Sequence, residues 1–573
     1  MSFAALDLGA RAMAATLLQH LKPGDRVLLS YPSGLEFILA FFGCLYSGIV
    51  AVPAYPPTSS LEVGRLERIA QSCGASAVCV ARSGFDGTRV AIAGSPLLRS
   101  LACITLPASF DESAQAWLPP DLQSDTLALL QYTSGSTGAP KGVMVSHGNL
   151  MHNQRLIKAA FGHTEQTLGV SWLPLYHDMG LIGHVLQSLY LGITTVLMSP
   201  VAFIAKPARW LQAISDYKAT SSGGPDFAFD LCTRRVTAEQ MMGLDLSSWK
   251  VAFSGAETIR DVTLARFAEK FSVCGFRRNA LTSCYGMAEA TLLVTAGVKR
   301  RAPTVRRVDA AALQRHLVRP VEAVGDQDIA IVSCGRPVGQ EVAIVDPHTR
   351  LRCRSEQVGE IWVRGPGVAR GYWNSVQESA ATFEARIADS GDGPFLRTGD
   401  LGFLENGELF VTGRVKDLIV IDGRNYYPSC IEAAVRASHP ALEGGAAAAF
   451  SVQLEGQERL VVVHEVHRHV LQRLPHAEVR SAARHALMCQ LGLPLQDLVL
   501  LHQGSLPKTS SGKIRRHDSR KAYLDNALNW QAVEKPADGR VSSMTARLIQ
   551  REGERRALRI PSPRLPKTAD DLA

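Results

Sequence analysis

Short apolar strands alternate with helical stretches along the first half of this chain, and this alternation limits the possible folds more than any other feature. From about residue 25 to 300, runs rich in β-branched or apolar residues are separated by segments with helical patterning. Examples of these runs are Ala77–Val80, Leu127–Tyr132, Thr194–Met198 and Lys250–Ser254. Strands that alternate with helices in this way are typical of an α/β architecture with largely parallel sheets.

The most apolar stretch, Phe37–Ala54, is about as long as a membrane span. Two glycines and a proline interrupt it, and Ser33-Gly34-Leu35-Glu36 has the pattern of a capping box just before it. We therefore predict a strand at Arg26–Ser30, a buried helix to about Tyr46 and a second buried strand at Ile49–Ala54. This βαβ interpretation is favoured over a stable membrane span.

The pattern changes from about Val342 to Val411. Strands are predicted at Val342–Val345, Gly359–Val363 and Glu408–Val411, separated by turn-rich loops, and they indicate a small β-rich subdomain. Further strand and helix patterns continue to about Asn529.

The predicted fold class is therefore α/β, with three parts. Residues 1–413 are expected to form a large N-terminal domain of parallel-sheet α/β subdomains plus the β-rich subdomain. A smaller α+β C-terminal domain is expected at 414–530. Residues 531–573 are polar and charged, and we expect them to form a weakly ordered tail.

Charge and cysteine usage exclude several classes of protein. The formal net charge is +8, but the Lys and Arg residues are scattered, so nucleic-acid binding is not expected and anionic ligands or an acidic partner protein are favoured. The 11 Cys residues form no CxxC pair, which argues against a zinc ribbon or a disulfide framework. A reducing cytoplasm is the expected location.

The segment from Gln131 to Gly142 is the strongest local feature of the sequence. It follows the apolar run Leu127–Leu130 and contains several Gly residues, four Ser and Thr hydroxyl groups and Lys141. Glycines allow backbone N–H groups to approach a ligand closely, so the loop is interpreted as a phosphate cradle with one cation. It is not a Walker A loop, because Pro140 precedes the lysine. The alternative is a Gly/Ser loop without a ligand.

Other segments combine small residues with groups suited to a nucleotide. Small residues at Gly255-Ala256-Glu257, directly after a strand, allow a flat ring to lie against the backbone. In Ser283–Glu289, Tyr285 offers an aromatic face and Glu289 an oxygen ligand for Mg²⁺. Asp400, in a Gly-flanked turn, can accept hydrogen bonds from ribose hydroxyls, or it forms an ordinary Asx-turn. Each segment alone has a structural explanation that is at least as good.

Two further segments carry ionisable groups. His177 and Asp178 are flanked by glycine, which suggests a strand-to-helix corner facing a cavity, although a lone His is usually structural. Pro507–Arg516 is a second loop with hydroxyls and lysines, including Lys513, and the alternative is a basic linker. A metal-like cluster near His464 does not fit HExxH, and we expect His464 and His469 at the surface of a strand.

Taken in order, these segments resemble the adenylate-forming superfamily of acyl-CoA synthetases, luciferases and adenylation domains, over about residues 20 to 520. Within it the chain is similar to the fatty acyl-AMP ligases. That resemblance rests on Gly48–Pro57, Leu173–Leu181, Gly223–Ala228 and an extra segment at about 298–331. In that family such an insertion restrains domain motion and disfavours transfer to free CoA.

The resemblance implies a role for each matching residue. Nucleotide phosphates would be held by Thr133, Ser134, Gly135, Ser136, Thr137, Gly138 and Lys141. Adenine and ribose would be held by Gly255, Ala256, Glu257, Tyr285, Gly286, Met287, Asp400 and Arg414. The acyl group would lie near Gly224, Pro225, Asp226 and Phe227, with His177 bordering the carboxylate. Lys513 would bridge the carboxylate and the α-phosphate, Glu289 would bind Mg²⁺, and Lys416 would be the hinge of a mobile C-terminal domain.

The expected reaction is the ATP-dependent conversion of a medium- or long-chain fatty acid to acyl-AMP and pyrophosphate. Since a carboxylate must approach a polyanion, positioning and cations such as Lys141, Lys513 and Mg²⁺ would lower the barrier. The acyl group would then pass to the phosphopantetheine thiol of an acyl carrier protein acting in trans, for polyketide or lipopeptide synthesis. Two alternatives are a fatty acyl-CoA synthetase and a non-catalytic lipid-binding scaffold.

Overall fold

The computed structural model describes residues 1–57, 59–82, 86–134, 140–322, 325, 327–467, 475–509, 512–525 and 527–528. The chain divides into two compact units. The first consists of Met1–Leu418, Arg424–Ser429 and Thr509–Lys513. The second consists of Ile419–Gly423, Cys430–Lys508 and the described residues from Ile514 on.

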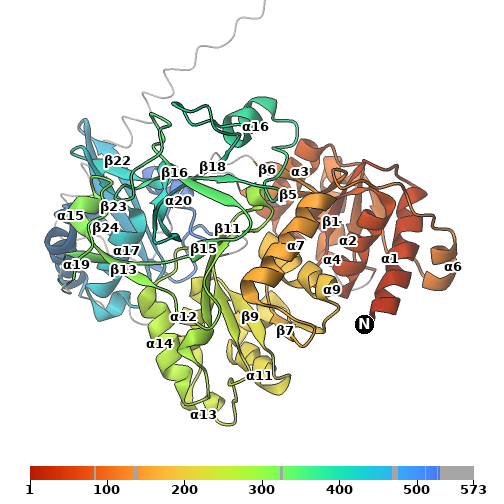
Figure 1. The fold of residues 1–573 in the computed structure, drawn as a ribbon, viewed down its shortest axis with the longest axis horizontal. Helices are drawn as coiled ribbons and strands as arrows, with labels where there is room; N and C mark the ends of the chain where they lie inside the picture. Colours follow the sequence, from red (N-terminus) through yellow and green to blue (C-terminus); the bar gives the residue numbers. More distant parts are fainter. Residues whose placement is uncertain are drawn as a thin grey trace, which may run out of the picture. The chain divides into compact units, whose positions relative to one another are not determined.

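The first unit begins with a six-stranded sheet in the order β4-β3-β1-β2-β5-β6. Neighbouring strands are parallel except β5 and β6, which form an antiparallel pair at one edge. Figure 1 shows α1 and α2 side by side next to β1. The strands are β1 (Arg26–Ser30), β2 (Val50–Ala54), β3 (Ala77–Val80), β4 (Ala102–Ile104), β5 (Leu127–Ser134) and β6 (Pro140–Ser146), and the helices are α1 (Phe3–Leu18), α2 (Leu35–Ser47), α3 (Ser60–Cys73), α4 (Asp86–Gly94), α5 (Pro96–Arg99) and α6 (Phe110–Gln115).

The predicted βαβ unit is confirmed as β1, α2 and β2. Helix α2 has 13 residues, about 20 Å, which is too short to cross the hydrocarbon core of a bilayer. It ends at Gly48, whose φ of 69° suits glycine. The predicted capping box is wrong: Gly34 is the N-cap, and the Ser33 hydroxyl instead accepts a hydrogen bond from the Leu175 backbone at 3.1 Å.

A second, seven-stranded sheet has the order β15-β12-β11-β10-β9-β7-β8. Strands β8, β7, β9, β10 and β11 are parallel, whereas β12 and β15 add antiparallel strands at the edge. The strands are β7 (Gly169–Ser171), β8 (Thr195–Leu197), β9 (Ser221–Gly224), β10 (Val251–Ser254), β11 (Leu281–Gly286), β12 (Leu293–Ala296) and β15 (Arg336–Pro337).

Helices cover this second sheet. They are α7 (His147–Phe161), α8 (Asp178–Gly180), the π-helix η1 (Leu181–Leu186), α9 (Gln187–Leu191), α10 (Pro200–Ala205), α11 (Ala208–Asp216), α12 (Asp226–Arg235), α13 (Ala238–Met241), α14 (Asp261–Ser272) and the 3₁₀ turns η2 (Arg278–Ala280) and η3 (Ala288–Ala290). Helix α7 begins with a capping box between Ser146 and Asn149, which fixes its start immediately after β6.

The predicted β-rich subdomain is confirmed as an antiparallel sheet in the order β16-β17-β18-β19. Its elements are β16 (Glu341–Val345), β17 (Gly359–Arg364), α16 (Val376–Phe383), β18 (Leu396–Glu405), β19 (Glu408–Arg414) and the 3₁₀ turn η4 (Val415–Asp417). The expected mixture of parallel α/β sheets and a β-rich part is thus present.

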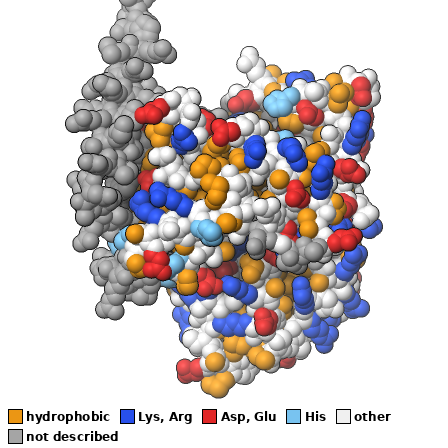
Figure 2. Space-filling view, turned by 90° about the vertical axis from the view of Figure 1, so that its left-hand side faces the viewer, with side chains coloured by type: hydrophobic (Ala, Val, Ile, Leu, Met, Phe, Trp, Pro, Cys, Tyr) orange, Lys and Arg blue, Asp and Glu red, His pale blue; other side chains and the backbone are white. Residues whose placement is uncertain are grey.

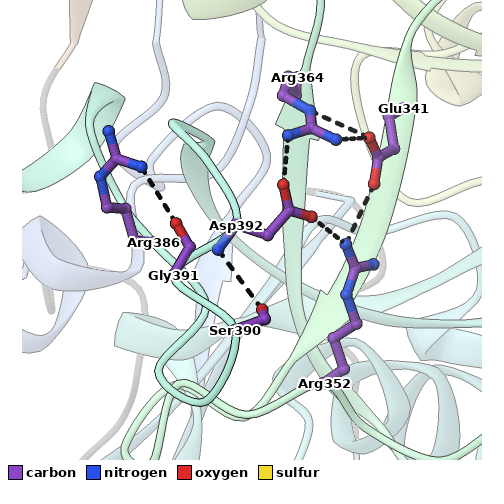
Figure 3. Close-up of polar contacts among 7 residues, drawn as sticks. All are labelled: Glu341, Arg352, Arg364, Arg386, Ser390, Gly391 and Asp392. Atoms are coloured by element: carbon purple, nitrogen blue, oxygen red, sulfur yellow. Dashed lines mark hydrogen bonds and ion pairs between the residues drawn. The ribbon is translucent and has the colours of Figure 1, made fainter.

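A closed ring of ion pairs joins the first two strands of this sheet to a neighbouring loop (Figure 3). Arg364 and Arg352 alternate with Glu341 and Asp392, so each charge has two opposite neighbours. The Arg352–Asp392 distance is 2.8 Å, and the Arg364–Asp392 distance is 2.6 Å. All four side chains are between 34% and 45% exposed, so solvent screens the ring.

The extra segment noticed in the sequence contains elements of its own. Strands β13 (Val305–Asp309) and β14 (Asp328–Val332) form an antiparallel pair, with α15 (Ala310–Leu313) following β13. Strand β21 (Arg424–Tyr426) also belongs to the first unit.

The second unit is built on a sheet in the order β22-β23-β24, in which β22 and β23 are antiparallel and β23 and β24 parallel. Its elements are β20 (Ile419–Ile421), α17 (Pro428–Ala437), η5 (Pro440–Leu442), β22 (Ala447–Leu454), β23 (Gln457–Val466), α19 (His476–Leu491), β24 (Leu495–His502) and α20 (Arg516–Leu524). The surface position predicted for His464 is wrong. It lies fully buried on the central strand, where Nδ1 contacts the Glu465 carbonyl oxygen at 2.8 Å. His469 lies outside the described residues.

Across the part of the chain that the structure describes, no helix has both the length and the hydropathy needed to cross a membrane. On the face shown in Figure 2, Lys and Arg side chains are interspersed with Asp and Glu side chains. This distribution agrees with the scattered charge seen in the sequence.

Candidate active site

The chemistry-bearing segments follow the carboxyl ends of parallel strands. Asp178 lies shortly after β7, Asp226 follows β9, Glu257 follows β10 and Tyr285 lies at the end of β11. In open α/β sheets, ligands bind in the crevice outside these carboxyl ends. The topology therefore brings together residues that are far apart in the sequence.

Tyr285, Asp400 and Arg414 form a connected set. The Tyr285 hydroxyl donates to Asp400 Oδ2 at 2.8 Å, and Arg414 Nε lies 2.8 Å from Asp400 Oδ1. Asp400 is 6% exposed, whereas the Arg414 side chain is 58% exposed. Burial and the neighbouring Asp400 carboxylate raise the pKa of Tyr285, and Asp400 raises the pKa of Arg414. The set presents an aromatic ring, a hydrogen-bond-accepting carboxylate and a permanent cation in direct contact with one another.

The turn that carries Asp400 is fixed from the neighbouring strand. Gly399 has a φ of 71°, in the region that favours glycine. Its N–H donates to buried Glu360 Oε1 at 3.1 Å, and the Asp400 N–H donates to the Thr398 hydroxyl at 3.0 Å. Glu360 also pairs with Arg397 at 2.7 Å. Asp400 is therefore held in place before any ligand arrives.

Glu289 and Lys141 meet through Tyr372. The Tyr372 hydroxyl donates to Glu289 Oε1 at 2.9 Å, and Lys141 Nζ lies 4.9 Å above the Tyr372 ring. Lys141 also pairs with Glu378 at 3.1 Å. Burial raises the pKa of Glu289, so this carboxylate lacks full compensation by cations. A buried carboxylate in this condition is suited to a divalent cation.

Asp226 lies at the start of α12, and the side chain of Glu257, which follows β10, reaches the same helix start. Glu257 accepts a hydrogen bond from the Phe227 N–H at 2.7 Å. Burial, together with the nearby Asp226 carboxylate, raises the pKa of Glu257 to about 7. Asp226 itself is 1% exposed and is paired with Arg260 at 2.7 Å. Both carboxylates thus have structural partners in addition to any role with a ligand.

Close backbone approaches flatten the surface around these groups. A Cβ at Gly255 would lie 2.7 Å from the Cys284 sulfur, and one at Gly286 would overlap the Leu292 carbonyl oxygen. Ala256 has a φ of 68°, which is uncommon for a residue with a Cβ. Backbone packing around β10 and β11 therefore requires glycine at positions 255 and 286, and neither residue adds a side chain at the carboxyl ends of these strands.

Lys513 lies in the first unit among the carboxylates of Asp178, Glu257 and Asp400, each of which raises its pKa. Burial has a larger effect and lowers the pKa, with Arg414 acting in the same direction. Asp178 shows the complementary behaviour, because burial raises the pKa of its carboxyl and Lys513 lowers it. The Lys513 ammonium thus interacts electrostatically with three acidic groups.

The remaining predicted residues have varied surroundings. His177 is the N-cap of α8, and its ring lies 4.8 Å from that of Tyr176. Gly224 packs on Trp172, since a Cβ there would lie 2.6 Å from the indole, and Phe227 contacts the same indole edge-on at 5.9 Å.

The other predicted site residues are placed by the elements that carry them. Thr133 lies in β5, Pro225 is the N-cap of α12, Met287 is the N-cap of η3 and Lys416 lies in η4. Gly135, Ser136, Thr137 and Gly138 lie outside the described residues, as does the side chain of Ser134.

Sequence reasoning missed two residues of this site. Tyr372 has no local signal, because its contact with Glu289 spans 83 positions of the chain. Glu360 also has no local sequence signal. It is buried on a strand, pairs with Arg397, which lies 37 positions away, and holds the Asp400 turn in place. Asp178 was noticed only as a neighbour of His177, and that adjacency is the signal that could have identified it.

Comparison with known proteins gives a consistent result. A family model described as AMP-binding enzyme matches residues 1–373. The chain is 45% identical to the medium-chain-fatty-acid–[acyl-carrier-protein] ligase JamA of Moorena producens, over 93% of this chain and 91% of that protein. It is 36% identical to the long-chain-fatty-acid–AMP ligase FadD32 of Mycolicibacterium smegmatis, over 90% and 88%.

Solved structures agree with this similarity. A fatty acyl-adenylate ligase of Legionella pneumophila, in complex with acyl adenylate and pyrophosphate, is 41% identical with a TM-score of 0.72. It covers 92% of this chain and 91% of its own. A structure from a study of fatty acyl-adenylate ligases of E. coli and L. pneumophila is 31% identical with a TM-score of 0.81, covering 92% and 93%.

Proposed function

This chain belongs to the AMP-binding enzyme family, and we propose that it activates a medium- or long-chain fatty acid with ATP, forming acyl-AMP and pyrophosphate. The acyl group then passes to the phosphopantetheine thiol of an acyl carrier protein. The observation that carries this proposal is the connected set of Tyr285, Asp400 and Arg414, whose Asp400 carboxylate also interacts electrostatically with Lys513. Similarity to ligases named for fatty acids, AMP and acyl-carrier protein supports the substrate class.

Adenosine binds, in this proposal, at the set formed by Tyr285, Asp400 and Arg414. Asp400 accepts hydrogen bonds from the ribose hydroxyls, while Arg414 contacts the ribose from the exposed side. The flat backbone at Gly255-Ala256-Glu257 and the ring of Tyr285 enclose adenine. The connected contacts at 2.8 Å support this assignment, because the groups are held in place in advance.

The phosphates and the carboxylate need cations. Residues 133–138 and Lys141 hold the β- and γ-phosphates, and Lys513 lies between the acyl carboxylate and the α-phosphate. Its ammonium is poised to stabilise charge that develops as carboxylate oxygen attacks phosphorus and pyrophosphate leaves. No general base is needed, because a fatty acid is already ionised at neutral pH. His177 borders the carboxylate.

Glu289 is the residue that would hold Mg²⁺. Its raised pKa marks a buried carboxylate short of positive charge, and Mg²⁺ binds through one or two carboxylates plus substrate phosphates. When bound, the ion would neutralise phosphate charge. Tyr372 would keep the Glu289 carboxylate oriented through its hydrogen bond of 2.9 Å.

The acyl chain extends past Gly224, Pro225 and Phe227 toward the apolar side of the second sheet. Residues 414–530 act as a C-terminal domain that moves about a hinge at Lys416, and the segment 298–331 restrains that motion and disfavours free CoA. The carrier protein acts in trans. All 11 cysteines are free thiols, which supports a reducing cytoplasm as the location.

Product analysis tests the proposal. The protein is incubated with decanoic acid, ATP and Mg²⁺, alone, with CoA or with a phosphopantetheinylated carrier protein, and the products are identified by mass spectrometry. We expect acyl-AMP alone in the first reaction, little acyl-CoA in the second and acyl-carrier protein in the third. Efficient formation of acyl-CoA would show that the protein is a fatty acyl-CoA synthetase instead. If no acid of any length gave pyrophosphate release, an adenylating activity would be excluded and the non-catalytic lipid-binding scaffold would be favoured.

A further inference from the structure

Lys513 lies on a short loop, the lysine loop, whose described residues are Lys508, Thr509, Gly512, Lys513 and Ile514. Thr509 and Lys513 belong to the first unit, whereas Lys508 and Ile514, at the two ends of the loop, belong to the second. Lys508 and Ile514 pair as an isolated antiparallel bridge. The Thr509 N–H donates to the Lys513 carbonyl oxygen at 2.8 Å, and the Lys513 N–H donates to the Thr509 hydroxyl at 3.0 Å. The loop is therefore closed at its base, and the position of Lys513 depends on what holds that base.

Arg516 lies three residues after Lys513, at the start of α20, and forms a two-point ion pair with Glu432 of α17. Arg516 Nε lies 2.7 Å from Glu432 Oε1, and Arg516 Nη2 lies 2.8 Å from Glu432 Oε2. Glu432 is 7% exposed, and its Oε1 also accepts a hydrogen bond from the Ala449 N–H of β22 at 3.0 Å. Two parallel hydrogen bonds fix both the distance and the direction between the groups. One end of the lysine loop is thus tied to a helix and a strand of the second unit.

The chain before the loop has a different attachment. Lys508 Nζ lies 3.0 Å from Glu465 Oε2, and the Leu506 N–H donates to Glu465 Oε1 at 2.9 Å. Glu465 is 1% exposed, so it is at least as buried as Glu432. An ammonium group on a flexible stem makes a point contact, which constrains direction less than a guanidinium fork does. The bond from Leu506 comes from the backbone and does not depend on the Lys508 side chain.

A firm attachment matters because of the task that the proposed function gives to Lys513. Its ammonium must lie between the acyl carboxylate and the α-phosphate when charge develops there. A displacement of about 1 Å, caused by a change far from the reacting atoms, can cost about 10²-fold in rate. Gly512 faces the ring of Phe227, where an added Cβ would lie 3.6 Å from Cε1, so the loop reaches a residue assigned to the acyl site.

We propose that Glu432 and Arg516 are positioning residues for adenylate formation, because their ion pair fixes the lysine loop so that the Lys513 ammonium reaches the acyl carboxylate and the α-phosphate. Neither residue contacts the substrate, and both act through Lys513. The inference rests on the proposed function, because it requires Lys513 to stabilise the charge that develops during adenylation. It names the residues on which that stabilisation depends.

Fatty-acid-dependent ATP–pyrophosphate exchange with decanoic acid tests the inference in Arg516→Lys and Glu432→Gln. Arg516→Lys keeps the positive charge and loses the fork, whereas Glu432→Gln keeps the side-chain volume and an acceptor for the Ala449 N–H. Each variant should lower kcat at least about 10-fold, because the Lys513 ammonium is then no longer held at one position. The KM for ATP should stay at the wild-type value, because the residues assigned to adenosine are unchanged.

Lys508→Ala is the matched control. It leaves buried Glu465 without its cation, so it destabilises the second unit in the same way as loss of the Arg516 fork. It should nevertheless keep the wild-type kcat, since the pair of Arg516 and Glu432 is intact. Thermal unfolding identifies any variant that is not folded at the assay temperature, and the other substitution in the pair then provides the test.

Combination with Lys513→Ala separates a positioning role from a structural one. Because Arg516 acts only through the Lys513 ammonium, adding Arg516→Lys to Lys513→Ala should leave the residual exchange rate unchanged. A pair that only stabilised the fold would lower the rate by the same factor in both backgrounds, because independent losses multiply.

The outcomes are distinguishable. Wild-type kcat in a folded Arg516→Lys or Glu432→Gln variant would overturn the inference and leave the proposed function standing. The same conclusion would follow from an equal loss in Lys508→Ala, or from a multiplied loss in the combination with Lys513→Ala. Absence of exchange in the wild type with every acid would overturn both the inference and the proposed function.

Discussion

Tyr285 Oη donates to Asp400 Oδ2 at 2.8 Å, which connects the last parallel strand of the second sheet to the β-rich sheet. Asp400 in turn pairs with Arg414 at 2.8 Å. A single carboxylate therefore links an aromatic ring on β11 to a cation at the end of β19. If this set binds adenosine, its charge is essential as well as its shape.

Asp400→Asn is expected to raise the KM for ATP at least about 10-fold, because an amide cannot pair with Arg414 or accept at both oxygens. Steady-state exchange at varied ATP concentrations measures this change. Asp389→Asn, at an exposed loop position, is the control and should leave KM unaltered. Equal KM values for Asp400→Asn and the wild type would remove Asp400 from the nucleotide site.

Glu360 and Glu341 provide a test of buried against exposed ion pairs. Glu360→Ala leaves Arg397, the Trp362 indole N–H and the Gly399 N–H without their partner, so it should lower the free energy of unfolding by about 3–5 kcal/mol. Glu341→Ala, in the exposed ring of Figure 3, should cost about 1 kcal/mol or less. Urea unfolding of both variants provides the comparison. Similar losses in the two variants would contradict this difference.

Glu257 should make stability depend on pH. Its pKa is raised to about 7, above the ordinary value of 4.5, so its contribution is complete below pH 4.5 and is lost as pH rises to about 7. The loss should be about 2 kcal/mol, since the residue is partly exposed and solvent screens it. Glu257→Gln should flatten this part of the profile. Urea unfolding between pH 4.5 and pH 8 measures it, and parallel profiles for the variant and the wild type would exclude Glu257 as the cause.

Glu289→Gln keeps an acceptor for the Tyr372 hydroxyl but removes the negative charge. The Mg²⁺ concentration needed for half-maximal exchange should therefore rise about 10-fold. Glu384→Gln, at an exposed position after α16, is the matched control. If both variants show the wild-type Mg²⁺ dependence, Glu289 is not the metal residue.

The sequence predicted most of the fold because its strands carry local signals. The bounds of β1 and β3 were predicted to the residue, since each is a short, continuous apolar run flanked by turn residues. His464 was misplaced because residues 460–466 of its strand are buried on both faces of the sheet, so alternate side chains do not point to solvent. The capping-box prediction was wrong because of a tertiary contact. The Ser33 hydroxyl accepts a hydrogen bond from the backbone N–H of Leu175, which is distant in the sequence.

Only the part of the site that has local sequence signals was predictable. Tyr285, Glu289 and Asp400 lie in short segments whose composition is unusual, so each attracts notice alone. Their partners do not, because Tyr372 and Glu360 act through contacts that only the tertiary fold creates. Local patterns identify groups that contact a ligand more readily than the groups that position them.

The exchange of labelled pyrophosphate into ATP, dependent on a fatty acid, tests the central claim most directly when wild type and Lys513→Ala are compared. Lys508→Ala, in the same segment and paired with Glu465 at 3.0 Å, is the control. We predict rapid exchange in the wild type and a loss of about 10²–10³ in Lys513→Ala, or about 3–4 kcal/mol, while ATP still binds. Exchange that is equally fast in Lys513→Ala, or that does not depend on the fatty acid, would contradict the account.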